Sequence, residues 1–177
     1  MSTEICVLSD VRLASIAEWQ ASIKIEDFPL RLPEGEPLAG AAGGNLLTQL
    51  RDKQTIIEYS VVDFSELKLT YKNVNFGHDW KYVIAFTWSS DFDEELVAWM
   101  AATAYARATG GVIFDEHEGK LHTPEESVQI LREIERRQPE LKTLLQNHLQ
   151  GLSAKSPEAA EALREFLQRR LTKSEDR

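Results

Sequence analysis

Residues 80–88, WKYVIAFTW, are the most strictly patterned segment of the chain. Successive residues of a strand point to opposite faces of a sheet, so the aromatic and aliphatic residues at every second position from 80 share one face. The other face carries Lys81, Val83, Ala85 and Thr87. This alternation predicts a β-strand, and the fold must therefore supply partner strands and a layer that covers the apolar face.

Further strands are expected before and after this segment. They are short apolar runs, or runs rich in β-branched and aromatic residues, at 4–8, 28–32, 55–64, 67–74 and 112–115. Pro29 places the 28–32 strand at an edge of the sheet or at the start of a strand. Ser65 and Glu66 would join 55–64 to 67–74 in a hairpin, although neither residue is the Gly or Asn that tight hairpin turns prefer.

One helix, over 92–109, has clear signals at both ends. Asp91 and Glu94 fit a capping box with Asp in place of Ser or Thr. The alanines between them and the end of the helix favour helix formation and would allow close packing on a sheet. Gly110 and Gly111 supply a left-handed position that ends the helix.

The other helices of the first two thirds are less clearly marked. A helix over roughly 11–25 is expected to begin at Asp10 and to carry apolar residues at helical spacing. Residues 45–53 predict one short helix, and 33–45, with their Gly and Pro residues, predict a loop. The 11–25 and 92–109 helices are expected to pack on one face of the sheet.

The last third is expected to be helical. Thr123, Pro124 and Glu126 form a strong helix start, and apolar stripes continue over roughly 124–172. The sequence therefore predicts an α+β fold with a largely antiparallel sheet covered by two helices. We expect an α+β domain over 1–122 and a C-terminal helical extension over 123–177 that packs on the same domain.

The charge is unevenly distributed. Residues 1–123 carry 19 acidic and 10 basic side chains, whereas 124–177 carry 10 of each, so the net charge of −9 belongs to the first part. A nucleic-acid partner would require a stripe of Lys and Arg, and an anionic membrane would repel this chain. The excess of acidic residues therefore argues against a nucleic-acid partner and against an anionic membrane. It would keep the protein soluble or attract a basic protein partner.

Known catalytic motifs are absent from the sequence. It contains no G-x-S-x-G, no G-x-x-x-x-G-K-[ST] and no G-x-G-x-x-G. Cys6 is the only cysteine and is expected to be a buried, inert residue. No signal peptide and no run of about 20 apolar residues is present, so a cytoplasmic location is expected.

The densest polar cluster with possible chemistry follows the 112–115 strand. Asp115, His117, Glu118 and His122 could offer oxygen and nitrogen ligands to a divalent metal. The two histidines are five residues apart rather than four, which does not match the helical HExxH motif. The favoured interpretation is a solvated hairpin with Gly119 at its tip and no metal.

Two groups of residues are candidates for protein binding. Asp91, Asp93, Glu94 and Glu95 form the densest acidic run, which would attract a basic partner but would equally suit a helix N-terminus. Trp80 and Trp88 are expected in the core, with exposure as interface anchors as the alternative.

Two blocks carry a resemblance to other proteins. They are LSDVRLASIAEWQASI, followed by FPLRL, and ATAYARATGGVIFDEHEGKL, in which an Ala-rich helix leads through Thr109, Gly110 and Gly111 to a strand that ends at Asp115. Together they resemble small uncharacterised bacterial α+β proteins, among them immunity partners of secreted toxins. The resemblance implies a protein-binding module and carries over no catalytic residues.

These observations predict a non-enzymatic, acidic protein-binding module without a cofactor, or more narrowly a toxin-neutralising immunity protein. Two alternatives stay open. One is a metal-assisted hydrolase that uses the Asp115, His117, Glu118 and His122 cluster. The other is a scaffold or adaptor that acts through its C-terminal helices, which could also join copies of the chain.

Overall fold

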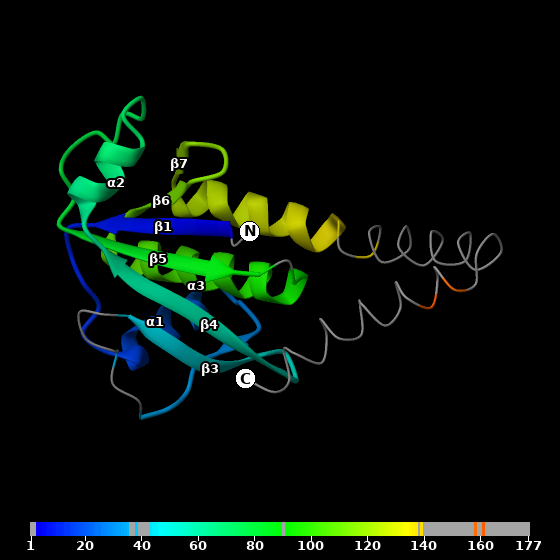
Figure 1. Cartoon of the computed structure of the whole chain (residues 1–177). Helices are drawn as coiled ribbons and strands as arrows, with labels where there is room; N and C mark the ends of the chain where they lie inside the picture. Colours follow the sequence, from blue (N-terminus) through cyan, green and yellow to red (C-terminus); the bar gives the residue numbers. More distant parts are fainter. Residues whose placement is uncertain are drawn as a thin grey trace. The chain divides into compact units, whose positions relative to one another are not determined.

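One antiparallel sheet of seven strands organises the part of the chain that the structure describes (Figure 1). The strands are β1 (Thr3–Ser9), β2 (Leu30–Arg31), β3 (Gly44–Leu50), β4 (Lys53–Val62), β5 (Tyr82–Trp88), β6 (Val112–Asp115) and β7 (Lys120–His122). Their order across the sheet is β2-β3-β4-β5-β1-β6-β7. The expected α+β class with an antiparallel sheet is confirmed.

The computed structural model describes residues 3–35, 38, 43–89, 91–137, 139, 158 and 161. The chain divides into two compact units, Met1–Arg132 and Glu133–Arg177. The domain boundary expected at residue 123 stays a prediction. Most of the expected C-terminal helices, and much of the 33–45 loop, lie outside the described residues.

Helices cover the two faces of the sheet unequally. Helices α1 (Ile16–Ile25) and α3 (Phe92–Thr109) lie on one face, as expected for these two elements. The short α2 (Phe64–Thr70) and the loop after it lie on the other face, over one end of the strands. A further helix begins at Pro124 and packs against α3, where Ser127 Oγ lies 2.9 Å from Thr103 Oγ1.

The core on the first face is centred on Trp19. Its ring makes edge-on contacts with Tyr59, Phe86 and Tyr105, with ring centroids 5.4–6.1 Å apart. Its indole Nε1 also donates a hydrogen bond of 2.9 Å to the carbonyl of Ala101 in α3. These contacts fix α1 between the sheet and α3, because a buried indole N–H must find an acceptor.

A smaller core lies on the opposite face. There Cys6, Phe114 and Val83 project from the sheet against Leu67 of α2 and Phe76 of the following loop. Strand β5 is buried on both faces along most of its length, so its alternation separates two cores rather than a core and solvent. The strand predicted at 80–88 is thus confirmed from Tyr82 onward.

Residues 45–53 do not form the expected helix. They lie in β3, in the turn that follows it and at the first residue of β4, with Leu47 opposite Ile56 in the ladder. Leu46, Thr48 and Leu50 alternate into the core. Leucine and glutamine favour helices when isolated, but pairing with a neighbouring strand overrides that weak preference.

The expected strand at 67–74 and its hairpin are also wrong. Asp63 accepts a hydrogen bond of 2.7 Å from the Ser65 amide and so caps α2. The chain after β4 therefore enters a helix and does not turn back into an adjacent strand. The hairpin lies earlier in the chain, between β3 and β4, and turns at Arg51 with φ 57°. Two-residue hairpin turns need such a positive φ, which the sequence signals only weakly when no Gly is present.

The first helix starts later than expected. Ser15 caps α1, and its hydroxyl accepts a 3.2 Å hydrogen bond from the Glu18 amide. Asp10 instead accepts a hydrogen bond from the Lys81 amide and lies 3.0 Å from His78 Nε2. The carboxylate thus joins two loops at the end of the sheet.

Gly110 and Gly111 end α3 for two different reasons. Gly110 has φ 64° and takes the left-handed position, as predicted for this pair. At Gly111 an added Cβ would lie 2.4 Å from the carbonyl oxygen of Leu8 in β1. The second glycine therefore allows the chain to pass against the central strand.

We expect Gly111→Ala to destabilise the protein more than Gly110→Asn does. The methyl group added at position 111 would overlap the β1 backbone, at a cost of about 2 kcal/mol. At position 110, in contrast, Asn tolerates the left-handed conformation. Chemical denaturation of both variants measures this difference in the free energy of unfolding. Equal losses would contradict the close approach at Gly111.

Candidate protein-binding site

Three glutamates lie in a row on the sheet face opposite α1 and α3. In the strand registers Glu58 of β4 faces Thr87 of β5, which in turn faces Glu4 of β1. Glu116 follows directly after β6, whose Asp115 pairs with Ile5, so it continues the line beside Glu4. We call Glu58, Thr87, Glu4 and Glu116 the acidic row. It contains no lysine or arginine.

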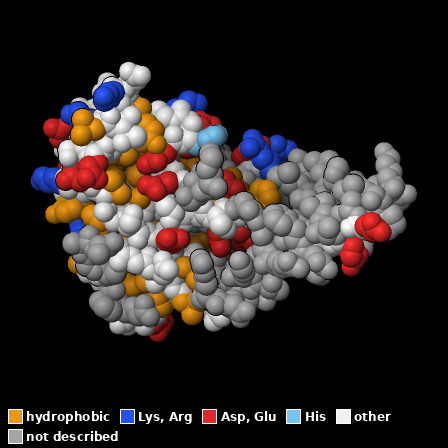
Figure 2. Space-filling model, in the orientation of Figure 1, with side chains coloured by type: hydrophobic (Ala, Val, Ile, Leu, Met, Phe, Trp, Pro, Cys, Tyr) orange, Lys and Arg blue, Asp and Glu red, His pale blue; other side chains and the backbone are white. Residues whose placement is uncertain are grey.

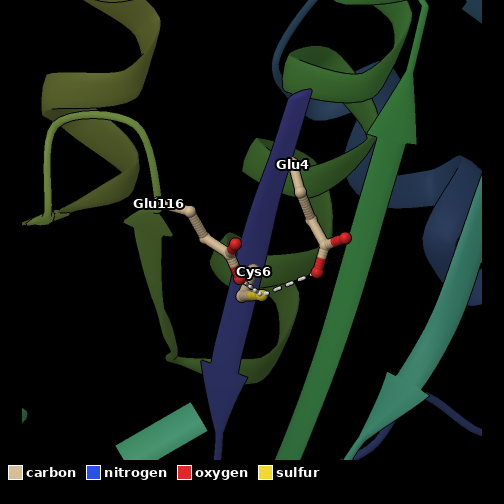
Figure 3. A group of neighbouring side chains, drawn as sticks. All are labelled: Glu4, Cys6 and Glu116. Carbon is tan, nitrogen blue, oxygen red and sulfur yellow. Dashed lines mark hydrogen bonds between the residues drawn. The ribbon is translucent and has the colours of Figure 1, made fainter. Parts of the chain in front are cut away.

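Two members of the acidic row, Glu4 and Glu116, lie on either side of Cys6 (Figure 3). The Cys6 thiol lies 3.4 Å from Glu116 Oε1 and 3.8 Å from Glu4 Oε1, so its single S–H hydrogen has a carboxylate acceptor on either side. Cys6 itself is 0% exposed, while both glutamates are half-buried. The expectation of a buried cysteine is confirmed, and its surroundings are acidic rather than purely apolar.

Burial and the carboxylates of this cluster change the pKa values of its members. Burial, and then the charge of Glu116, raise the pKa of Glu4 above its ordinary value. Burial and the two neighbouring carboxylates raise the pKa of the Cys6 thiol, which keeps the thiol protonated and unreactive. Tyr71 donates a 2.8 Å hydrogen bond to Glu116 Oε2, and burial and this bond raise the pKa of its phenol. The cluster thus concentrates acidic groups without a cation among its members.

Part of this sheet face is open to solvent. Tyr71, after α2, covers the row only at Glu116, whereas Glu58 and its cross-strand neighbour Asn45 are exposed. Beside them Leu47 is 55% exposed and pairs with the partly buried Ile56. Figure 2 shows acidic side chains gathered over the strands of this face. The surface therefore combines carboxylates with a small apolar area.

The residues at 115–122 form a hairpin, as the favoured interpretation predicted. Asp115 Oδ1 accepts hydrogen bonds from the amides of His117 at 2.8 Å and Glu118 at 3.1 Å, and Gly119 has φ 65° in the turn. Donor atoms of Asp115, Glu118 and His122 lie within 4.8 Å of one another. His117 is exposed and does not belong to this group.

The acidic run at the start of α3 is engaged locally. Asp91 accepts from the Asp93 and Glu94 amides and caps the helix, while Glu94 accepts a 2.9 Å hydrogen bond from the Ser89 amide. Asp93 pairs with Lys53 of β4 at 2.9 Å. Glu95 lies in the same first helical turn. The acidic run is therefore explained by its place at a helix N-terminus, where carboxylates are stabilising.

The two candidate tryptophan anchors are placed differently. Trp88 is 8% exposed and belongs to the buried core. Trp80 is partly buried and donates from Nε1 to the Phe76 carbonyl at 3.0 Å. Its ring lies against His78, with centroids 3.9 Å apart and the ring planes inclined by 43°. Neither ring projects freely as an interface anchor would.

Comparisons of the chain with family models, curated proteins and solved structures found no match. Within the described residues, no helix has the length and the apolar character that crossing a membrane requires. The choice of a site therefore depends on geometry and charge alone.

Sequence reasoning did not identify the acidic row. Glu4 and Cys6 are two residues apart in a predicted strand, which already places them on one face. Glu116 is 110 residues beyond Cys6, and Tyr71 lay in a segment predicted as a strand. Only the pairing of β1 with β6 brings these groups together.

Glu4→Gln is expected to stabilise the protein at neutral pH. A raised pKa means that the folded state favours protonated Glu4, so its ionised form weakens the fold as pH rises through that pKa. Glutamine keeps a donor toward Glu116 without the charge, and we expect a gain of about 0.5 kcal/mol. Urea denaturation at pH 7 and below about pH 4 measures it, because the advantage should disappear in acid.

Glu58→Gln is the matched control for this prediction. It removes one charge from the same row at an exposed position whose cross-strand neighbours are Thr87 and Asn45, not another carboxylate. Its effect on stability should be small at both pH values. A Glu4→Gln gain that persists in acid would argue against burial of the Glu4 charge beside Glu116 as its cause.

Proposed function

We propose that the protein binds a basic protein through the open half of the sheet, with the acidic row at the centre of the interface. The observation that carries this proposal is the line of three glutamates across β4, β1 and the end of β6, which together with Thr87 make up the whole row among the described residues. It narrows the non-enzymatic, acidic binding module expected from the sequence to one surface.

Electrostatics supports a cationic partner. Glu4 and Glu116 hold their charges close together in a half-buried position, and this repulsion contributes to the raised pKa of Glu4. A lysine or arginine side chain placed between them would remove that repulsion and satisfy both carboxylates. The net charge of −9 would also speed the first encounter with a basic partner.

The apolar area beside the row supports a protein rather than a small cation. Leu47 and Ile56 form a cross-strand pair on the same face, next to the exposed Glu58. Protein interfaces combine apolar contact area with charged residues, and the charged residues set partner choice and association rate. This combination suits a folded basic surface better than a free amine.

An immunity protein that neutralises a basic secreted toxin is the narrower form of the proposal. It is supported by the resemblance of the two sequence blocks, through Thr109, Gly110 and Gly111, to bacterial proteins that include such partners. Protection of cells that produce both the toxin and this chain would test it. A cytoplasmic location is part of this narrower proposal.

We expect neutralisation of the row to slow association with a basic partner. The double variant Glu4→Gln/Glu58→Gln should reduce the on-rate about tenfold at low salt, because the steering charges lie at the interface. Rising salt should reduce the wild-type on-rate, since screening acts beyond about 10 Å at 0.1 M. Surface plasmon resonance with a captured partner, or first with a lysine-rich peptide as a defined probe, measures both effects.

The charge-matched control is Asp93→Asn/Glu95→Gln at the start of α3. It removes the same net charge from the acidic run that the sequence favoured, so a general loss of steering would affect both variants equally. If the control variant lowers the on-rate more than the row variant does, the interface lies at the start of α3 instead. An on-rate insensitive to salt and to both variants would exclude an electrostatic interface.

A further inference from the structure

The β6–β7 hairpin holds a second group of convergent side chains, separate from the acidic row. One carboxylate oxygen each of Asp115 and Glu118 and one ring nitrogen of His122 lie within 4.8 Å of one another. Asp115 is adjacent to Glu116 in the chain but points to the opposite face of the sheet, toward α3. The group therefore plays no part in the proposed protein interface.

His122 brings a nitrogen that the fold leaves unsatisfied. Its Nε2 atom is shielded from solvent and has no hydrogen-bond partner among the described residues. The ring packs edge-on against Trp99 of α3, with centroids 6.3 Å apart, which restricts its orientation. A buried polar atom without a partner is costly and rare, so such an atom calls for an explanation. An imidazole nitrogen is also the commonest nitrogen ligand of metals.

The two carboxylates are held in different ways. The backbone amides of His117 and Glu118 both donate to Asp115 Oδ1, which orients that carboxylate and leaves Oδ2 for another partner. Glu118 is exposed and pairs with Lys120 at 3.0 Å, and the hydrogen bond from Lys120 lowers its pKa. An exposed ion pair of this kind is weak, so a bound cation could replace Lys120.

We propose that Asp115, Glu118 and His122 bind one divalent transition-metal ion. Imidazole nitrogen with carboxylate oxygen is a donor set that Zn²⁺ accepts, at bond lengths of about 2.0–2.2 Å. Tetrahedral coordination requires donors about 3.4 Å apart, so the three side chains, of which Glu118 is exposed, would have to draw closer together around the ion. Water would supply the fourth ligand. The ion would fasten the turn of the hairpin to β7.

A Zn²⁺ titration of the metal-stripped, untagged protein by isothermal calorimetry tests the site. We expect one ion per chain, and at least about tenfold weaker binding in Glu118→Gln and in His122→Gln. His117→Gln is the matched control, since it removes a neighbouring exposed imidazole outside the group, and it should leave the affinity unchanged. Glu118 is exposed, so Glu118→Gln retains its value as a test even if His122→Gln is poorly folded.

Three results would overturn the proposal. They are absence of stoichiometric binding, binding that survives both ligand substitutions, and an equal loss in His117→Gln. The Glu4, Cys6 and Glu116 cluster also offers three donors within 4.8 Å, so the ion could bind there instead. The absorption spectrum of bound Co²⁺ distinguishes the two sites, because only one of them contains sulfur. A sulfur-to-cobalt charge-transfer band would assign the ion to Cys6 and contradict the hairpin site, whereas a spectrum without that band supports it.

Discussion

Helix α3 is buried on almost every side, and the packing of the first unit depends on how closely the neighbouring elements can approach its backbone. Its alanines leave the backbone accessible, so the Trp19 indole and the Ser22 hydroxyl of α1 reach the carbonyls of Ala101 and Ala104 at 2.9 and 2.7 Å. Larger side chains at those positions would separate the two helices. The sheet and the helix that begins at Pro124 pack on the remaining sides of α3.

This arrangement explains why the opposite sheet face can carry charge. Because α1 and α3 supply the main core on one face, α2 needs to cover only one end of the other face. The row with Glu58, Glu4 and Glu116 lies where that cover ends, between a buried apolar cluster and solvent. There the carboxylates are still partly hydrated, yet burial and repulsion by Glu116 raise the pKa of Glu4.

The two candidate sites differ in how far sequence alone could predict them. Asp115, Glu118 and His122 are close in the chain, and a strand followed by a Gly-containing turn already suggested a hairpin that brings them together. The sequence could not exclude His117, because the turn geometry decides which side chains converge. The acidic row depends instead on the strand order, which places β1 between β5 and β6. No local signal relates Glu4 to Glu116.

The sequence by itself determined the elements whose signals are local and strong. The strand at β5, the caps of α3 and the Thr123–Glu126 capping box each follow from a residue pattern within the segment itself, and the structure contains all three. Tertiary structure decided the segments at 45–53 and 67–74. In the first, pairing with β4 outweighed helix propensity. In the second, the Asp63 cap and the burial of Leu67 outweighed an alternating pattern, because burial against the sheet contributes more free energy than local preference.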